Sequence, residues 1–245
     1  LLESIILKHG KIVSFDQLKE IFEKEYSLEE LRNRISLLAK KGWLLRMKRW
    51  LYVVITDIAT LGFNDVSEYI ISRALTLDSY ISFENSLQYY SMFDQMLASI
   101  DAVTDKRART YKMQNTTYRF FHLKKELYFG FTEVQVSGKL INMADREKAL
   151  LDMLYFRSST LTVSLVLEKF REYEHQIDFA KLKEYAKRYS LTMVREVGYL
   201  LDRLNIATED LYSSSNVKKN SYSKMTKDAS AFNAKWRLYY DSNLT

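Results

Sequence analysis

The chain has 245 residues, of which 47% are hydrophobic and 28% are charged, a balance that is typical of globular proteins and excludes a disordered chain. Its 37 basic residues outnumber its 31 acidic residues, and the net charge of +6 favours a polyanionic partner. Cysteine is absent and no apolar run is long enough for a membrane span, so we expect a cytoplasmic protein without disulfides, thiol chemistry or a membrane segment.

Residues 1–9 predict a first helix, and two capping boxes predict where the next two helices begin. In one box Ser14 is followed three residues later by Gln17, and in the other Ser27 is followed by Glu30. Each pair can satisfy amide groups that the first helical turn leaves without partners. Gly42 is placed to end the third helix in a left-handed conformation. The apolar residues of that helix fall on one stripe, formed by Leu28, Leu31, Ile35 and Leu38.

A basic hairpin is predicted directly after the third helix. Two short apolar segments, 43–45 and 50–54, flank it, and residues 40–49 hold five cations and no acid. Three helices followed by such a hairpin are the plan of a winged helix-turn-helix. We therefore expect a DNA-binding domain over residues 1–56. The alternative interpretation is an ordinary amphipathic helix whose basic end is solvated.

In helix-turn-helix proteins the last helix enters the major groove, and its N-terminal half touches base edges. Arginine can read guanine, and asparagine can read adenine, through paired hydrogen bonds. The polar residues that we predict to face DNA from this helix are Ser27, Glu29, Arg32, Asn33, Arg34 and Ser36. Cations at the helix end and in the hairpin are predicted to hold phosphates, namely Lys40, Lys41, Arg46, Lys48 and Arg49.

The rest of the chain predicts an α+β protein in which a mixed α/β C-terminal domain, with antiparallel strands and a helical bundle, follows the winged helix-turn-helix. A connecting helix is expected within 57–78, the C-terminal domain over 79–212, and a polar loop with a terminal strand over 213–245. The predicted strands cover 100–103, 117–122, 133–136, 139–143 and 234–240. The predicted helices cover 64–77, 82–90, 143–156, 161–173, 179–189 and 191–204.

Two further stretches are strongly basic. Residues 104–125 hold seven cations against one acid, and residues 213–237 hold six against one. In the first stretch, Lys106, Arg107 and Arg109 lie in a predicted loop and form a possible secondary nucleic-acid contact. The other interpretation, which we favour, is a solvated hairpin whose cations protect an exposed strand edge from aggregation.

An enzyme is not expected. His9, His122 and His175 lie far apart, so no metal-spaced cluster is present in the sequence. No glycine-rich phosphate loop or nucleophile elbow occurs either. We therefore predict no catalytic residues, no metal and no cofactor.

Five segments beyond the N-terminal domain have residue patterns that suggest a known family. They are residues 80–87, 103–109, 147–155, 198–201 and 235–237. Together with the winged helix, and in this order, they resemble the AbiEi antitoxin family of bacterial abortive-infection systems. The resemblance covers nearly the whole chain. Family members often have a glycine where this chain has Trp50, and a proline where it has Arg146.

The resemblance implies a two-domain antitoxin that represses its own toxin–antitoxin operon through the winged helix, in phage defence. Its C-terminal domain would counteract a nucleotidyltransferase toxin without necessarily touching it. We expect a monomer or weak dimer that binds an inverted repeat of promoter DNA as two copies. Two alternatives remain open: a protein-interaction module that binds and inhibits a toxin directly, and a stand-alone ligand-responsive repressor with a deep apolar pocket in the C-terminal domain.

Overall fold

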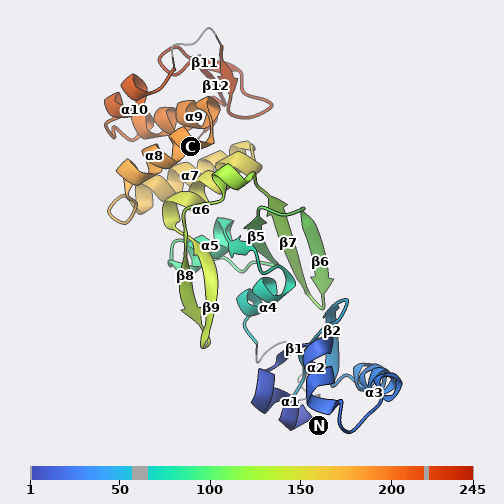
Figure 1. Ribbon diagram of the computed structural model, residues 1–245. Coiled ribbons are helices and arrows are strands. Elements are labelled where there is room, and N and C mark those ends of the chain that lie inside the picture. Colours follow the sequence, from blue (N-terminus) through green and yellow to red (C-terminus); the bar gives the residue numbers. More distant parts are fainter. Residues whose placement is uncertain (1, 57–65, 218–220, 245) are drawn as a thin grey trace.

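A computed structural model describes residues 2–56, 66–217 and 221–244 of the protein, which has a mixed α+β fold. The N-terminal elements lie at one end of the molecule (Figure 1). A six-stranded sheet occupies the middle, and most of the later helices and the last strands lie at the other end.

The N-terminal elements are α1 (Leu2–His9), β1 (Ile12–Ser14), α2 (Phe15–Phe22), α3 (Leu28–Lys40), β2 (Leu44–Lys48) and β3 (Leu51–Val54). Both predicted capping boxes are present, with Ser14 accepting from the Gln17 amide and Ser27 from the Glu30 amide. Gly42 has a φ of 82°, as its predicted role after α3 requires. The three strands form an antiparallel sheet in the order β1-β3-β2.

The central sheet contains β4 (Ser79–Ile81), β5 (Ser99–Thr104), β6 (Arg109–Met113), β7 (Thr116–His122), β8 (Phe131–Val136) and β9 (Lys139–Ala144). Its order is β6-β7-β5-β4-β9-β8, and the pairs β5–β7 and β4–β9 are parallel. The expectation of antiparallel strands is therefore only partly right. Strand β6 was not predicted, because its exposed cations and hydroxyls hide the alternation that marks a half-buried strand.

Helix α4 (Glu68–Leu75) precedes β4 in the chain, and helix α5 (Phe83–Tyr89) lies between β4 and β5. The other helices are α6 (Arg146–Phe156), α7 (Thr160–Glu172), α8 (Phe179–Tyr189), α9 (Leu191–Arg203) and α10 (Glu209–Ser214), with a short 3-10 helix at Lys125–Leu127. Helix α10 was not predicted, and its last two residues fall in the segment from residue 213 onward that was expected to be a loop. The part of the predicted connecting helix that falls on residues 57–65 lies outside the described residues.

A second small sheet closes the chain, with β10 (Ser223–Lys224), β11 (Ala231–Asn233) and β12 (Leu238–Tyr240) in the order β10-β12-β11. The predicted strand over 234–240 is shortened to three residues. Residues 234–237 instead form the turn between β11 and β12, in which Arg237 has a φ of 51°.

The N-terminal elements pack directly against the central sheet. Met47 and Val53 of the hairpin share one buried cluster with Ile71 and Leu75 of α4 and with strand residues of the sheet. A separate cluster inside the N-terminal elements holds α1, α2 and α3 together. The opposite sheet face and helices α6 to α9 enclose the largest cluster. The hairpin therefore packs against the central sheet on one face and against the N-terminal helices on the other. This packing fixes the position of α3 relative to the central sheet.

Candidate nucleic-acid interface

Helix α3 presents a polar face that nothing in the described chain covers. Its inward residues Leu31 and Ile35 are only 3% and 5% exposed. Arg32, Asn33 and Ser36 are all exposed, as are Glu29, Lys40 and Lys41. Leu28 was predicted to join the apolar stripe but is 44% exposed, because it lies in the first turn beyond the edge of the core. The predicted base-reading side chains are therefore available to a ligand.

A groove of about 310 Å³ separates α3 from the hairpin. Arg32 and Ser36 line it from the helix, and Arg46 and Trp50 line it from β2 and the hairpin turn. The other lining residues are Phe15, Ile35, Ala39 and Tyr52, so none of the described residues that line it is acidic. The helix and the hairpin thus share one positively charged surface.

Trp50 lies at the tip of the hairpin in a conformation that usually favours glycine. Its φ is 63°, and its carbonyl accepts a hydrogen bond of 2.9 Å from the Phe15 amide. The indole ring lies 4.8 Å from the Phe15 ring, and the Arg49 guanidinium lies 5.5 Å from the indole. These contacts hold the hairpin tip against the start of α2 and offset the strain of a left-handed tryptophan.

Lys48 does not join this surface, contrary to its predicted role as a phosphate contact. Its amine donates to the carbonyl oxygens of Ala74 and Leu75, at 3.2 and 2.7 Å. A β-bulge between Arg46 and Lys48 is the reason. The extra residue reverses the alternation of side chains, so Lys48 turns toward α4 while Arg46 faces the groove. Lys48 therefore caps the C-terminal end of α4, where a cation is favourable.

Two other predicted contacts also have partners within the protein. The Arg34 guanidinium lies 4.1 Å from the centroid of the Tyr26 ring and is not among the residues that line the groove. The Ser27 hydroxyl accepts from the Glu30 amide and donates to the Glu30 carboxylate at 2.7 Å. Arg34 and Ser27 are thus engaged in stacking and in helix capping.

The possible secondary contact lies on an edge of the central sheet. Lys106 is 3.3 Å from Asp105, Arg109 donates to the Tyr111 hydroxyl at 3.4 Å, and Arg107 is exposed. Strand β6 pairs only with β7, so its outer edge is unpaired within the described sheet. This geometry agrees with edge protection, and none of the three cations lines the groove beside α3.

A buried polar cluster in the C-terminal part was not foreseen. Asp152 accepts hydrogen bonds from Tyr80 and Ser82 and pairs with Lys148, whose amine also donates to the Leu127 carbonyl. The Tyr189 hydroxyl completes the cluster. Burial lowers the pKa of Lys148 and raises those of Tyr80 and Tyr189. The spacing of Lys148 and Asp152 by four residues was the available signal.

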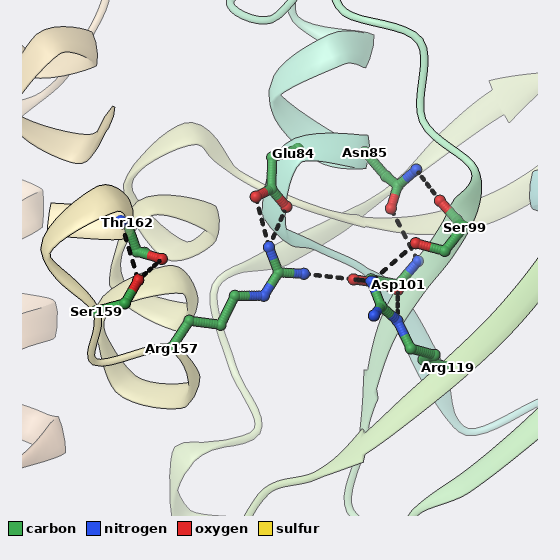
Figure 2. A network of polar contacts seen from close by, with 8 residues as sticks. All are labelled: Glu84, Asn85, Ser99, Asp101, Arg119, Arg157, Ser159 and Thr162. Carbon is green, nitrogen blue, oxygen red and sulfur yellow. Dashed lines mark hydrogen bonds and ion pairs between the residues drawn. The ribbon is translucent and has the colours of Figure 1, made fainter. Parts of the chain in front are cut away.

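A second network joins α5 and the end of α6 to the sheet (Figure 2). Arg157 donates to both carboxylate oxygens of Glu84, at 2.5 and 2.6 Å, and also bonds Asp101. Arg119 donates two hydrogen bonds, of 2.7 and 2.6 Å, to the Asp101 carboxylate. The side-chain oxygen of Asn85 accepts a hydrogen bond from the Asp101 amide. Two arginines thus balance two acids, and their hydrogen bonds are used to hold elements together.

A cavity of about 490 Å³ lies between the N-terminal elements and the central sheet. Its described lining combines residues 9–12, α4 and the turn between β8 and β9. It therefore does not lie inside the C-terminal domain, where the ligand-responsive alternative would place a pocket. Within the described ranges no group of three or more side chains suited to hold a metal occurs.

None of the helices in the described ranges combines the length and apolar character that a bilayer crossing requires. No family model matches the chain, and no curated protein matches it by sequence. Its fold is similar to that in the crystal structure of the RV2827C protein from Mycobacterium tuberculosis, with a TM-score of 0.66. The match covers 98% of this chain and 89% of that chain at 9% sequence identity, so the likeness concerns the fold alone.

Proposed function

We propose that the N-terminal elements form a winged helix that binds double-stranded DNA. The observation that supports this most is the shared groove, in which Arg32 and Ser36 of α3 stand opposite Arg46 of the hairpin without an acidic residue among the described lining. The order of three helices and a β-hairpin, with the last helix exposed, is the arrangement that winged-helix DNA-binding domains use.

In this proposal α3 enters the major groove. Arg32 and Ser36 line the groove and read base edges, together with Asn33, which is exposed beside Arg32 and has no side-chain partner among the described residues. Arg46 and Arg49 hold phosphates beside the hairpin, with Lys40 and Lys41 at the end of the helix. Lys48 is left out of the contact set, because its amine is bonded to α4.

The biological role that we propose is that of an antitoxin that represses its own operon, binding an inverted repeat as two copies. Support comes from the resemblance to the AbiEi family. Several segments of this chain that carry the resemblance contact one another in the structure. The segment 80–87 bonds the segment 147–155 through Asp152, and Gly198 packs against Trp236. The C-terminal part would counteract a nucleotidyltransferase toxin.

The test is binding of the full chain to the DNA upstream of its own gene, measured by fluorescence anisotropy. Arg32→Ala combined with Asn33→Ala should abolish the preference for this DNA over a scrambled duplex, since each lost base contact costs about 1–3 kcal/mol of discrimination. Arg46→Ala should instead weaken both duplexes alike and reduce the salt dependence by about one phosphate contact.

Arg34→Ala is the matched control, because it removes an arginine from the same helix but one that stacks on Tyr26. Its loss should leave the DNA preference unchanged. Equal preference for the promoter in wild type and in the Arg32 and Asn33 variant would refute the groove assignment. Separately, a stable stoichiometric complex on co-purification with a nucleotidyltransferase encoded beside this gene would favour the direct-inhibition alternative.

A further inference from the structure

The small C-terminal sheet carries a row of aromatic side chains on its outer face. In the sheet register Tyr239 of β12 lies opposite Lys224 of β10 on one side and Phe232 of β11 on the other. Tyr222 lies just before β10, and its ring contacts the Tyr239 ring on the same face. The neighbouring Leu238 points inward and is fully buried. We call Tyr222, Tyr239 and Phe232 the aromatic row.

The two outer rings of the aromatic row are open to solvent, and Tyr239 between them is half-buried. Tyr222 is 63% exposed and Phe232 is 49% exposed, whereas most large apolar side chains of this region are buried. The Tyr239 ring lies between them, with centroids 5.3 Å from Tyr222 and 4.9 Å from Phe232. Exposed aromatic groups at this spacing offer flat apolar surfaces to a ligand.

Cations flank the row, and the segment that contains Tyr222 and Lys224 has no acidic residue before Asp228. The Lys224 amine lies 5.7 Å from the Tyr239 ring, and Arg237 is fixed beside Tyr222 because its Nε donates to the Ser221 carbonyl at 3.0 Å. Residues 213–227 contain four lysines and no acidic residue. The charge of this region thus complements a polyanion.

Arg195 of α9 adds positive charge beneath the same strands. Its side chain belongs to a residue only 1% exposed, and it bonds neutral groups: the Ser223 hydroxyl at 3.1 Å and the Val217 carbonyl at 3.0 Å, with a longer contact to Ser221. No carboxylate pairs with it among the described residues, and its Nε has no hydrogen-bond partner there. An arginine remains charged when buried, so this charge is uncompensated inside the protein.

We propose that the outer face of this sheet binds single-stranded nucleic acid, with bases stacked on the aromatic row and phosphates held by Lys224 and Arg237. The faces of bases are accessible in single strands but hidden in a duplex, so an aromatic row flanked by cations selects the single strand. Uncompensated Arg195 strengthens the attraction for phosphate from below. A protein partner would need its own carboxylates to pair with these cations. The experiment below distinguishes a protein partner from a single strand.

The experiment measures anisotropy of labelled oligo-U and oligo-dT, each about 15 nucleotides long, with the full-length protein at low salt. Tyr222→Leu and Phe232→Leu keep apolar bulk and remove the rings, and each should weaken binding about fivefold or more, whereas Phe232→Tyr should bind like wild type. Lys224→Gln should lower the salt dependence by about 0.7, the value for one phosphate of a single strand. Comparison of the two oligonucleotides shows whether the site prefers RNA or DNA.

Leu7→Ala is the control for a distant apolar residue, since Leu7 is 88% exposed on α1, at the opposite end of the molecule from this sheet (Figure 1). It should not change oligonucleotide binding, and circular dichroism should show that the leucine variants retain the fold. Absence of oligonucleotide binding, or equal binding by the leucine variants, would overturn the proposal and leave the row to a protein partner or to sheet packing. Loss of binding in the Arg32→Ala and Asn33→Ala protein would also overturn it, by assigning the single strand to α3. Because the two surfaces use different residues, either proposal can fail without the other.

Discussion

Glu196 should make the protein less stable as the pH rises from about 5 to 8. This carboxyl lies on α9 and is 6% exposed, and no described residue forms a hydrogen bond or ion pair with it. Burial raises its pKa from 4.5 to about 8. Below pH 4.5 the carboxyl is protonated in both states, so it costs nothing. Between pH 4.5 and 8 only the unfolded state releases the proton, and stability falls.

The magnitude follows from the size of the pKa change. At about 1.4 kcal/mol per pH unit, a rise from 4.5 to about 8 corresponds to roughly 5 kcal/mol of lost stability once the pH passes 8. Water entry and local relaxation reduce this value, so we expect a loss of at least ~2 kcal/mol. Glu196→Gln has nearly the same shape and remains neutral, so it should remove this part of the pH dependence.

The assay is guanidinium denaturation of both proteins, followed by circular dichroism at several pH values between 4.5 and 8.5. Comparing the two proteins at the same pH cancels the titration of every other group. The variant should match wild type near pH 4.5 and gain stability steadily toward pH 8. A difference between the proteins that stays constant across this range would refute the reasoning, because it would mean that the folded carboxyl ionises normally.

Two further substitutions test the packing and the hairpin. Gly198→Ala should destabilise the protein by more than ~2 kcal/mol despite the higher helix propensity of alanine, because the new Cβ would lie 2.3 Å from the Trp236 indole. In guanidinium denaturation the loss should be smaller when Trp236→Phe is present as well, and additive losses would contradict a direct clash. Lys48→Met should lower the thermal midpoint, since two carbonyls at the end of α4 lose their donor, but should reduce DNA affinity less than Arg46→Ala in the anisotropy assay. An equal loss of DNA affinity would return Lys48 to the phosphate contacts.

Local sequence signals predicted the N-terminal elements well. The capping boxes at Ser14 and Ser27 depend only on residues three positions apart, and Gly42 acts through its own backbone, so both could be read without tertiary information. The exposed face of α3 followed from the spacing of Leu31 and Ile35. The shared groove followed less directly, because it depends on how the hairpin folds back on the helix.

Signals that depend on tertiary structure were missed. The bulge that turns Lys48 away has no marker in the sequence, since Arg46 and Lys48 would share one face in a regular strand. The parallel pairing of β5 with β7 is decided by the path of the chain between them. Arg195 and Glu196 fall in the predicted helix over 191–204, where charged residues are expected to face solvent, but α9 is enclosed on nearly all sides, and this buries both of them.

The arrangement of the elements makes the two proposed surfaces separable. Helix α3 lies at one end of the molecule and strands β11 and β12 lie at the other, with the central sheet and the helices between them (Figure 1). The cluster around Met47 and Leu75 fixes the first surface to the sheet, and the cluster around Trp236 fixes the second to α9. A duplex on α3 would therefore leave the aromatic row open, and substitutions such as Phe232→Leu should not alter promoter binding. Competition between a promoter duplex and a short single strand for one molecule of protein would contradict this arrangement, because it would require that both ligands use the same surface.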